Sequence, residues 1–336
     1  MWQQDPRNNQ ILFLSIFLVL GISTRDWTLR PDLILVVIVS CLLTQWLAAF
    51  LCSNPKYRSV IKNSGDFGRS FLGLPLGFNP KPDFKTTLES TLKSCKIQTL
   101  ETSLNLLIKP ANLSQDNNAS FSSSPQSPSL KSAMITALSL SLLLRADNYS
   151  TMVLAGSLGI LSKFIFRVEG KHFFNPANFG IIAVLILTND AWVSPGQWGD
   201  DGWYGLLFAG TGSMVLKRVG RWDTTAAFLG AYAVLEGIRN FWLGWSWDVF
   251  CHRLMSGSLL LFALFMLTDP RSIPNARISR LLWAVCIALL TFILRNQLFM
   301  PTAIFWALFA LSPLSVLLDF IWSSTRFSWH DSDSVE

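Results

Sequence analysis

The chain has 336 residues, of which 51% are hydrophobic and 14% charged, and its formal net charge is +6. Soluble domains carry about 25% charged residues, so this composition excludes an ordinary water-facing globule and predicts that lipid is part of the solvent. The positive charge does not indicate nucleic acid as a partner, because the basic residues gather in alternate loops between apolar runs, which is a membrane-topology pattern.

Ten apolar runs are candidates for membrane spans, each of which needs roughly 20 residues. The first begins close to Met1 without a small-residue cleavage site, so we expect a retained helix. Several runs are short, which is typical of the interrupted helices of repeat-built transporters but also of inexact boundaries. The predicted spans are Gln10–Ser23, Pro31–Cys52, Ser132–Leu144, Thr151–Phe166, Pro176–Leu187, Trp203–Leu216, Thr225–Leu243, Phe250–Leu267, Ile278–Leu294 and Phe299–Ile321.

The basic residues predict the orientation of these spans. Loops after odd-numbered spans hold few, whereas loops after even-numbered spans are rich in them, and the positive-inside rule places such loops in the cytoplasm. We therefore expect a multi-pass protein of the cell inner (plasma) membrane with both termini cytoplasmic. The basic residues after even-numbered spans are Lys56, Arg58, Lys62, Arg167, Lys171, Lys217, Arg218, Arg221, Arg271, Arg277, Arg280 and Arg326.

Four regions follow from these patterns. Residues 1–53 hold the first two spans, and 54–130 form a cytoplasmic insertion whose run Ser114–Ser129 is polar enough to be disordered. Residues 131–322 hold the eight-helix membrane core, and 323–336 form a cytoplasmic tail.

Cysteine and tryptophan are interpreted from their positions. Cys41, Cys251 and Cys286 lie in or beside apolar runs without metal-ligand spacing, so we expect buried structural thiols and no metal site. Six tryptophans near the predicted outer ends favour an interfacial belt over a stacking platform for a flat ligand: Trp192, Trp198, Trp203, Trp242, Trp245 and Trp247.

Charged residues within spans suggest function, because each costs free energy in lipid. Glu236 lies inside the seventh span, and Arg239 follows three residues later on the same helix face. Either the two form a structural ion pair or Glu236 is part of a pathway for H⁺ or Na⁺. Asp269 ends the eighth span, where it either caps a turn or marks the mouth of the pathway.

The fifth span opens with the sequence FFNPANFG at 173–180. Asn175 is a good N-cap, proline suits the first helical position, and Asn178 places an amide on the helix. Lys171 adds positive charge just upstream, so an anionic group of a cofactor fits this helix start, and so does an ordinary capped helix.

No nucleotide-binding loop, dinucleotide fingerprint, zinc-protease motif or catalytic triad is present. Three stretches instead resemble the NqrB/RnfD family of membrane subunits, which is shared by the Na⁺-translocating NADH:quinone reductase and the Rnf electron-transport complex: GKHFFNPANFG at 170–180, GRWDTTAAFLGAYAVL at 220–235 and HRLMSGSLLLFALFMLTDP at 252–270. The resemblance implies an all-α, ten-helix bundle that binds flavins.

In that family one FMN is attached to a threonine in an S/T-G-A-T motif. The corresponding region contains AGTGSM at 209–214, with Thr211 and Gly212 at the start of the motif and Met214 at the acceptor position. We therefore predict no covalent FMN. A non-covalent flavin, FMN or riboflavin, and a scaffold without a redox centre both stay open.

Two functions follow from the resemblance. The first is a membrane electron-transfer subunit that binds flavin or quinone, couples to Na⁺ or H⁺ movement, and has the lipid bilayer and other membrane or redox subunits as partners. The second is a non-redox transporter or channel-like protein on the same scaffold. In either case we predict that five polar residues face one interior cavity: Asn175, Asn178, Glu236, Ser256 and Asp269.

Overall fold

The computed structural model describes residues 6–24, 29–53, 130–168, 170–194, 210–212, 214, 220–325 and 327. All of them belong to one compact unit of the chain. The predicted insertion at 54–130 and the predicted sixth span at Trp203–Leu216 lie almost wholly outside the described residues.

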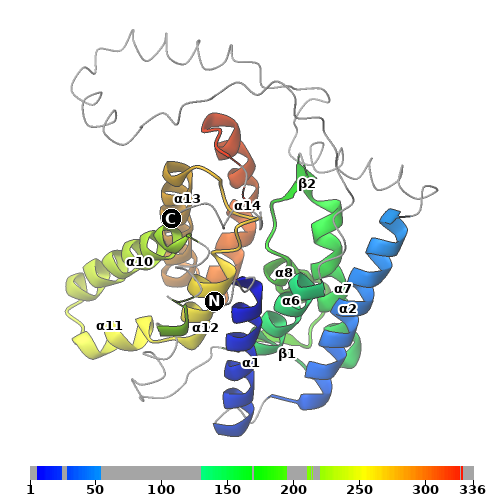
Figure 1. Cartoon of the computed structure of the whole chain (residues 1–336). Coiled ribbons are helices and arrows are strands. Elements are labelled where there is room, and N and C mark those ends of the chain that lie inside the picture. The colour runs from blue at the N-terminus through cyan, green and yellow to red at the C-terminus, as the bar shows by residue number, and fades with distance from the viewer. Residues whose placement is uncertain are drawn as a thin grey trace. The chain divides into compact units, whose positions relative to one another are not determined.

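Helices form where the sequence predicts spans, with ends shifted by a few residues (Figure 1). Their long apolar runs contain few residues that compete with helical hydrogen bonding, which is what lipid requires of a spanning segment. The helices are α1 (Pro6–Thr24), α2 (Pro31–Ser53), α6 (Leu130–Leu143), α7 (Tyr149–Ile165), α8 (Pro176–Leu187), α10 (Trp222–Trp242), α13 (Arg277–Asn296) and α14 (Ala303–Ile321).

The predicted eighth span, Phe250–Leu267, is not one continuous helix. It consists of α11 (Trp247–Leu254), α12 (Gly257–Leu261) and the π-helix η1 (Phe262–Met266), with a bend of 48° between α11 and the rest. Ser256 at the break has extended backbone angles, φ −71° and ψ 123°, and Gly257 follows it. Serine and glycine both favour breaks over helix interiors, which explains why the span divides here.

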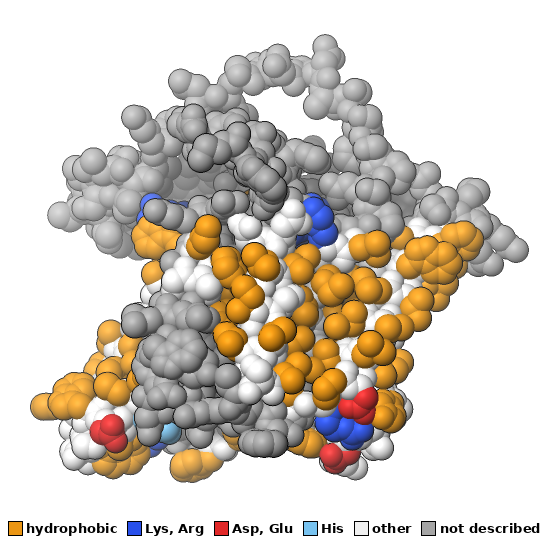
Figure 2. Space-filling model, turned by 60° about the horizontal axis from the view of Figure 1, so that its bottom comes forward, with side chains coloured by type: hydrophobic (Ala, Val, Ile, Leu, Met, Phe, Trp, Pro, Cys, Tyr) orange, Lys and Arg blue, Asp and Glu red, His pale blue; other side chains and the backbone are white. Residues whose placement is uncertain are grey.

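The helical membrane class predicted from the sequence is confirmed, whereas the number of ten spans stays a prediction. Within the described residues, three helices are long and apolar enough to cross a bilayer: α13, α14 and Pro31–Leu51 of α2. The bent pair α11 and α12–η1 makes a fourth if it is one span. Figure 2 shows hydrophobic side chains covering a broad face of the molecule with charged side chains toward its edges, as expected of a surface in contact with lipid.

The helices pack through close contacts between small residues. A Cβ atom built on Gly180 of α8 would lie 2.5 Å from the Ala155 carbonyl oxygen of α7, and one on Gly159 of α7 would lie 2.7 Å from the Pro176 carbonyl oxygen. Both positions therefore need glycine, as is common where membrane helices touch. Elsewhere α2 packs on α7, α10 on α13, and α13 on α14.

Two short antiparallel ladders mark opposite ends of the helices (Figure 1). At one end, β1 (Leu144–Ala146) pairs with β4 (Ala191–Val193), and nearby Tyr149 donates a hydrogen bond to Asp32. We call this the β1–β4 end. It gathers the loops that follow the first, third and fifth predicted spans.

At the other end, β2 (Arg167–Val168) pairs with β3 (Lys171–His172). Here Lys171 donates hydrogen bonds to Asp319 and to the Ile273 carbonyl, and Arg280 pairs with Asp223. This β2–β3 end gathers loops that follow even-numbered spans, so the described loops alternate between ends as the predicted topology requires.

The cysteine prediction is correct for one residue and wrong for two. Cys41 is buried between helices, whereas Cys251 and Cys286 are exposed. The apolar runs that carry the exposed thiols turn much of their hydrophobic surface outward. An apolar sequence therefore does not identify the interior of a membrane protein, because lipid accepts apolar side chains as readily as the core does.

Candidate functional site

The start of α8 has the capping geometry that its sequence predicts. Asn175 is extended, with φ −67° and ψ 125°, and its side chain accepts a hydrogen bond of 3.1 Å from the Asn178 backbone N–H. The Asn175 amide donates to the Met266 carbonyl (3.0 Å), and the Asn178 amide donates to the Phe305 carbonyl (3.1 Å). The Asn178 Oδ1 atom is buried and has no hydrogen-bond partner.

A polar hollow adjoins this helix start at the β2–β3 end. The space in it that water-sized molecules can occupy is about 70 Å³, and it is partly open to the surface. Its polar lining residues come from α1, α6, β3, the α8 cap and the turn after η1: Arg7, Gln10, Ser132, Thr136, Ser139, His172, Asn175, Thr268, Asp269 and Arg271.

An apolar slot lies next to the polar hollow. The two share Ser139, Phe265 and Met266 as lining residues. The rest of the slot is made of leucines from α1, α6 and α12: Leu14, Leu142, Leu143 and Leu261. The hollow thus presents polar groups beside the apolar groups of the slot.

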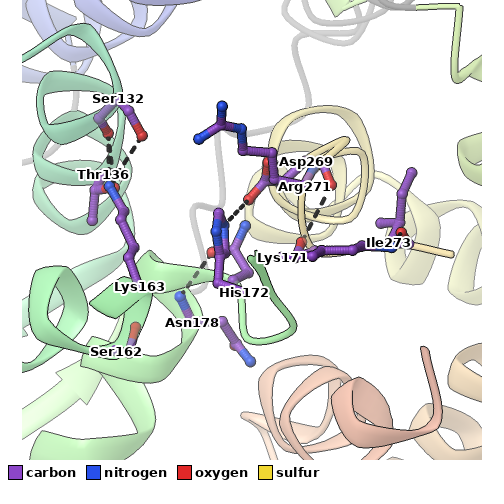
Figure 3. A network of polar contacts seen from close by, with 12 residues as sticks. Ser132, Thr136, Ser162, Lys163, Lys171, His172, Asn178, Asp269, Arg271 and Ile273 are labelled. Carbon is purple, nitrogen blue, oxygen red and sulfur yellow. Dashed lines mark hydrogen bonds and ion pairs between the residues drawn. The ribbon is translucent and has the colours of Figure 1, made fainter. Parts of the chain in front are cut away.

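His172 and Asp269 lie next to each other in the lining of the polar hollow (Figure 3). His172 Nε2 lies 3.6 Å from Asp269 Oδ2, and Asp269 Oδ1 accepts a hydrogen bond from the Arg271 backbone N–H. Burial lowers the pKa of His172, and the attraction to Asp269 opposes this only in part. Burial alone would raise the pKa of Asp269, but His172, the Arg271 backbone N–H and the positive charge of Lys163 together hold that pKa below its ordinary value.

Asp269 caps the turn after η1, as one of the two hypotheses from the sequence predicted, by accepting the hydrogen bond from the Arg271 backbone N–H. It also lines the polar hollow, and its place on an ion pathway stays a prediction. A carboxylate with a pKa below its ordinary value is ionised at neutral pH.

Lys163 of α7 is a buried lysine beside the polar hollow. It is 5% exposed, and its ammonium donates hydrogen bonds to the Ser132 carbonyl (3.2 Å) and hydroxyl (3.1 Å). In the described part of the chain it forms no ion pair with a carboxylate. Sequence analysis missed this residue, although a lysine within the run GILSKFIF is a signal of the same kind as Glu236.

Lys171 does not provide positive charge for a ligand at the start of α8, as the sequence predicted it would. Its ammonium pairs with Asp319 of α14 at 2.6 Å and also donates to the Ile273 carbonyl at 2.5 Å. Burial lowers the pKa of Lys171, and Asp319 opposes the shift. The residue therefore ties β3 to α14 and is not among the residues that line the polar hollow.

The π-helix η1 ends at the polar hollow, and side chains from three other elements bind its carbonyls. Thr225 of α10 donates to Ala263 (2.7 Å), Asn175 donates to Met266, and Gln10 of α1 approaches Phe265 (3.5 Å). The pairing of Leu267 N–H with the Phe262 carbonyl, five residues back, is what defines the π turn. Such turns are frequent at functional sites because they displace the side chains that follow.

Glu236 belongs to a separate cluster near the β1–β4 end. It is 2% exposed, and it accepts hydrogen bonds from Arg253 (2.8 Å) and from Asn296 (2.8 Å). The predicted pairing with Arg239 is wrong: the Arg239 guanidinium lies over the Trp245 ring, 4.7 Å from its centroid. The turn after Gly244 brings α11 back along α10, so a partner distant in sequence replaces the one on the same helix.

The remaining predicted residues lie apart from the polar hollow. Ser256 sits at the break before α12, where its hydroxyl is 2.9 Å from that of Ser258. Thr211 is half-buried, and the neighbouring Gly212 packs on Leu264 of η1. Asn175 and Asp269 are therefore the two predicted residues that line the hollow, and Asn178 lies directly behind it. Among the described residues, no group of His, Cys, Asp and Glu side chains could hold a metal ion.

Apolar helices, glycine contacts and a polar hollow at one end define a helical membrane protein with a candidate ligand site. Comparison with known families adds one finding: residues 193–328 match the model of the NQR2, RnfD, RnfE family. This match confirms the family resemblance predicted from the sequence, and it includes the second and third of the three motifs.

Curated proteins point in the same direction. The chain is 31% identical over 119 residues to the D subunit of an ion-translocating oxidoreductase complex from Vibrio vulnificus (strain YJ016), which is 35% of this chain and 34% of that protein. It is 27% identical over 107 residues to the protein of the same name from Actinobacillus pleuropneumoniae serotype 5b (strain L20), which is 31% of each chain. The matches thus span about a third of the length of these relatives.

Proposed function

We propose that this protein is an electron-transfer subunit of an ion-translocating oxidoreductase complex in the inner (plasma) membrane, and that it holds a flavin non-covalently in the polar hollow. The observation that carries the proposal is the polar hollow with its adjoining apolar slot, built at the FNPA helix start and at the end of the TDP motif. The comparisons support the class of complex, because the matching relatives are named as subunits of one.

The lining of the hollow and the slot has the chemical groups that bind a flavin, and neighbouring helices would have to move to admit the ring, because the two spaces measure about 70 and 10 Å³. A flavin ring is flat and apolar on its faces, with carbonyl and N–H groups along one edge. The slot offers Phe265 and Met266 to a ring face, and the hollow offers the amides of Gln10 and Asn175 to an edge. The neighbouring Asn178, whose backbone N–H bonds to Asn175, has a buried Oδ1 atom without a hydrogen-bond partner, which a water molecule would satisfy.

Each residue then has a definite role. Asn175, fixed by its bonds to Asn178 and Met266, orients the polar edge, while Phe265 and Met266 exclude water from the apolar body. His172 and the Asp269 carboxylate are the groups at the hollow that take up a proton when the charge on the ligand changes. When bound, a flavin supplies one- and two-electron transfer. A covalent link is not part of the proposal, since Met214 occupies the acceptor position.

Coupling to Na⁺ or H⁺ movement belongs to the same proposal, with Asp269 at the hollow as the residue placed to respond to charge on the ligand. Glu236 is fully paired with Arg253 and Asn296. Its geometry therefore supports a structural role better than a place on the ion pathway.

The test is the visible spectrum of the protein purified in mild detergent. We expect flavin absorbance, complete release of the flavin on denaturation, and much lower flavin content in Asn175→Leu. Asn189→Leu, at an exposed position of the β1–β4 end, is the matched control. A folded wild-type protein without colour would instead favour a non-redox transporter on the same scaffold.

A further inference from the structure

The turn between α10 and α11 exposes large aromatic side chains. Trp242 is 85% exposed and Phe241 81%, and both exceed every other large hydrophobic residue in the described part of the chain. All the residues from 241 to 248 are exposed. Figure 1 shows this turn projecting at the lower left, where α10 and α11 meet. Apolar groups exposed together indicate a surface that contacts something other than water.

The backbone of this turn is held by hydrogen bonds. The buried Asn240 amide donates to the Trp245 carbonyl (3.1 Å) and to the Ser246 carbonyl (3.2 Å). Gly244 has φ +66°, a conformation that glycine adopts without strain. The Trp247 ring then packs edge-on against Phe250, with 5.6 Å between the ring centroids. The exposed rings are therefore presented by a well-bonded turn.

The helix α11 has an apolar side and a polar side. Trp247, Cys251 and Leu254 follow one another at helical spacing on the first, whereas Asp248 and His252, four residues apart, share the second. Both polar residues are exposed. The bend of 48° directs α11 away from the axis of α12 and η1. A helix with two such sides suits the boundary between lipid and water.

The turn between α13 and α14 brings another exposed ring to the same end. Asn296, the last residue of α13, bonds to Glu236 and Arg253, so this turn lies beside α10 and α11. Phe299 is 80% exposed and has φ +54°, which is a strained conformation for a bulky residue. Trp192 of β4 is also exposed at the β1–β4 end. Exposed aromatic residues on three separate elements form a belt, as a bilayer boundary requires.

The surface of α10 leads from lipid to this belt. Val234 and Ile238, two turns and one turn before Trp242, are each 61% exposed. The Arg239 guanidinium lies over the Trp245 ring, and in the described part of the chain no carboxylate pairs with it. An arginine near the end of a membrane helix places its apolar stem along lipid and its charge at the level of the headgroups. The apolar face thus ends where polar groups begin.

We propose that residues 241–247 and Phe299 lie in the headgroup layer of the bilayer, with the apolar side of α11 toward the acyl chains and with Asp248 and His252 toward water. The partner of this surface is the phospholipid layer, and the rings fix the depth of the β1–β4 end in it. The sequence favoured a belt of tryptophans, to which the structure adds the orientation of α11 and Phe299. The inference does not depend on a bound flavin.

Electron paramagnetic resonance of spin-labelled full-length protein in liposomes of phosphatidylethanolamine and phosphatidylglycerol tests the depth. Single cysteines are introduced into a cysteine-free background by Trp242→Cys, Trp247→Cys, His252→Cys and Val285→Cys. Oxygen concentrates among acyl chains and a nickel chelate stays in water, so the ratio of their collision rates with a label reports its depth. We expect positions 242 and 247 to give ratios between those of Val285, on the exposed apolar face of α13, and His252.

Each other outcome overturns the proposal. A ratio at 242 or 247 equal to that at 252 would place the turn in water. A label shielded from both reagents would mean that protein covers the surface. A label at 252 as deep as that at 247 would refute the orientation of α11. Elution in size-exclusion chromatography checks folding. If Trp247→Cys alters it, the label is placed on the native Cys251, which is exposed on the same side of α11.

Discussion

At the scale of single residues, the buried carboxylates of α10 pair with partners distant in sequence. Arg280 and Asp223 pair across 57 positions at 2.6 Å, and Glu236 pairs with Arg253 and Asn296. Sequence analysis identified Glu236 as buried and polar but assigned its partner by helix spacing. Local spacing was a poor guide here because the chain returns beside α10 after the turn at Gly244.

Replacing Glu236 by glutamine should destabilise the protein. The change leaves the Arg253 guanidinium, which is about three-quarters buried, without its counter-ion. Breaking a buried pair costs about 3–5 kcal/mol, and we expect a loss near the lower end of that range because Arg253 is partly exposed. The measurement is the thermal midpoint in detergent. Arg239→Gln is the control and should change the midpoint little, because Arg239 forms no part of the pair.

Acidification should destabilise the fold through His172. Its pKa in the folded protein is lowered from the ordinary 6.5 by burial, so below pH 6.5 the unfolded chain binds a proton that the folded chain does not. Protonation of His172 therefore has little effect on the free energy of unfolding above pH 6.5. Below pH 6.5 this free energy falls as the pH is lowered.

The thermal midpoint at pH 7.5 and 5.5 measures this effect. His172→Gln should have a smaller difference between the two pH values than the wild type, whereas His252→Gln, at an exposed position of α11, should keep the wild-type difference. An unchanged difference in His172→Gln would show that another group is responsible.

At the scale of elements, the contact between α7 and α8 depends on two glycines. We expect Gly180→Ala to lower the free energy of unfolding by about 1–3 kcal/mol, the typical cost of overpacking, because the new Cβ would lie 2.5 Å from a backbone oxygen that cannot move aside. Gly230→Ala in α10 is the opposite case. No atom lies within 4 Å of its new Cβ, so it should be neutral or slightly stabilising.

The observed helices show which features of the fold could be predicted from the sequence. Helix positions follow from apolar runs, and the α8 start follows from Asn175 and Pro176, because both are local effects. The break at Ser256 was not predicted, although the Ser-Gly-Ser stretch was noted, because small residues also occur in continuous packed helices. The polar hollow could not be predicted from the sequence, because Arg7, Lys163 and Asp269 come together only through the packing of distant helices.

At the scale of the whole molecule, the alternation of loops between two ends is the feature to test. Asn189 lies at the β1–β4 end and Arg277 at the β2–β3 end, and both are exposed. We predict that single cysteines at these positions, in a cysteine-free background, react from opposite sides of the membrane, with position 277 facing the cytoplasm. Labelling of both cysteines from the same side would contradict the topology. If position 189 faced the cytoplasm and position 277 the outside, only the predicted orientation would be wrong.

The glycine contacts of α7 and α8 have a consequence for how a ligand enters. Backbones that touch at Gly159 and Gly180 cannot slide past one another, so this pair of helices, with the β2–β3 hairpin between them, moves as a single block. The opposite boundary contains α1, which contacts η1 through the Phe17 and Phe265 rings and through a long 3.5 Å hydrogen bond from Gln10, and no glycine in the described residues of either element brings their backbones into contact. The wall of the hollow that α8 forms is therefore rigid, whereas the wall that α1 forms can move. Ligand entry should depend on α1 rather than on α8.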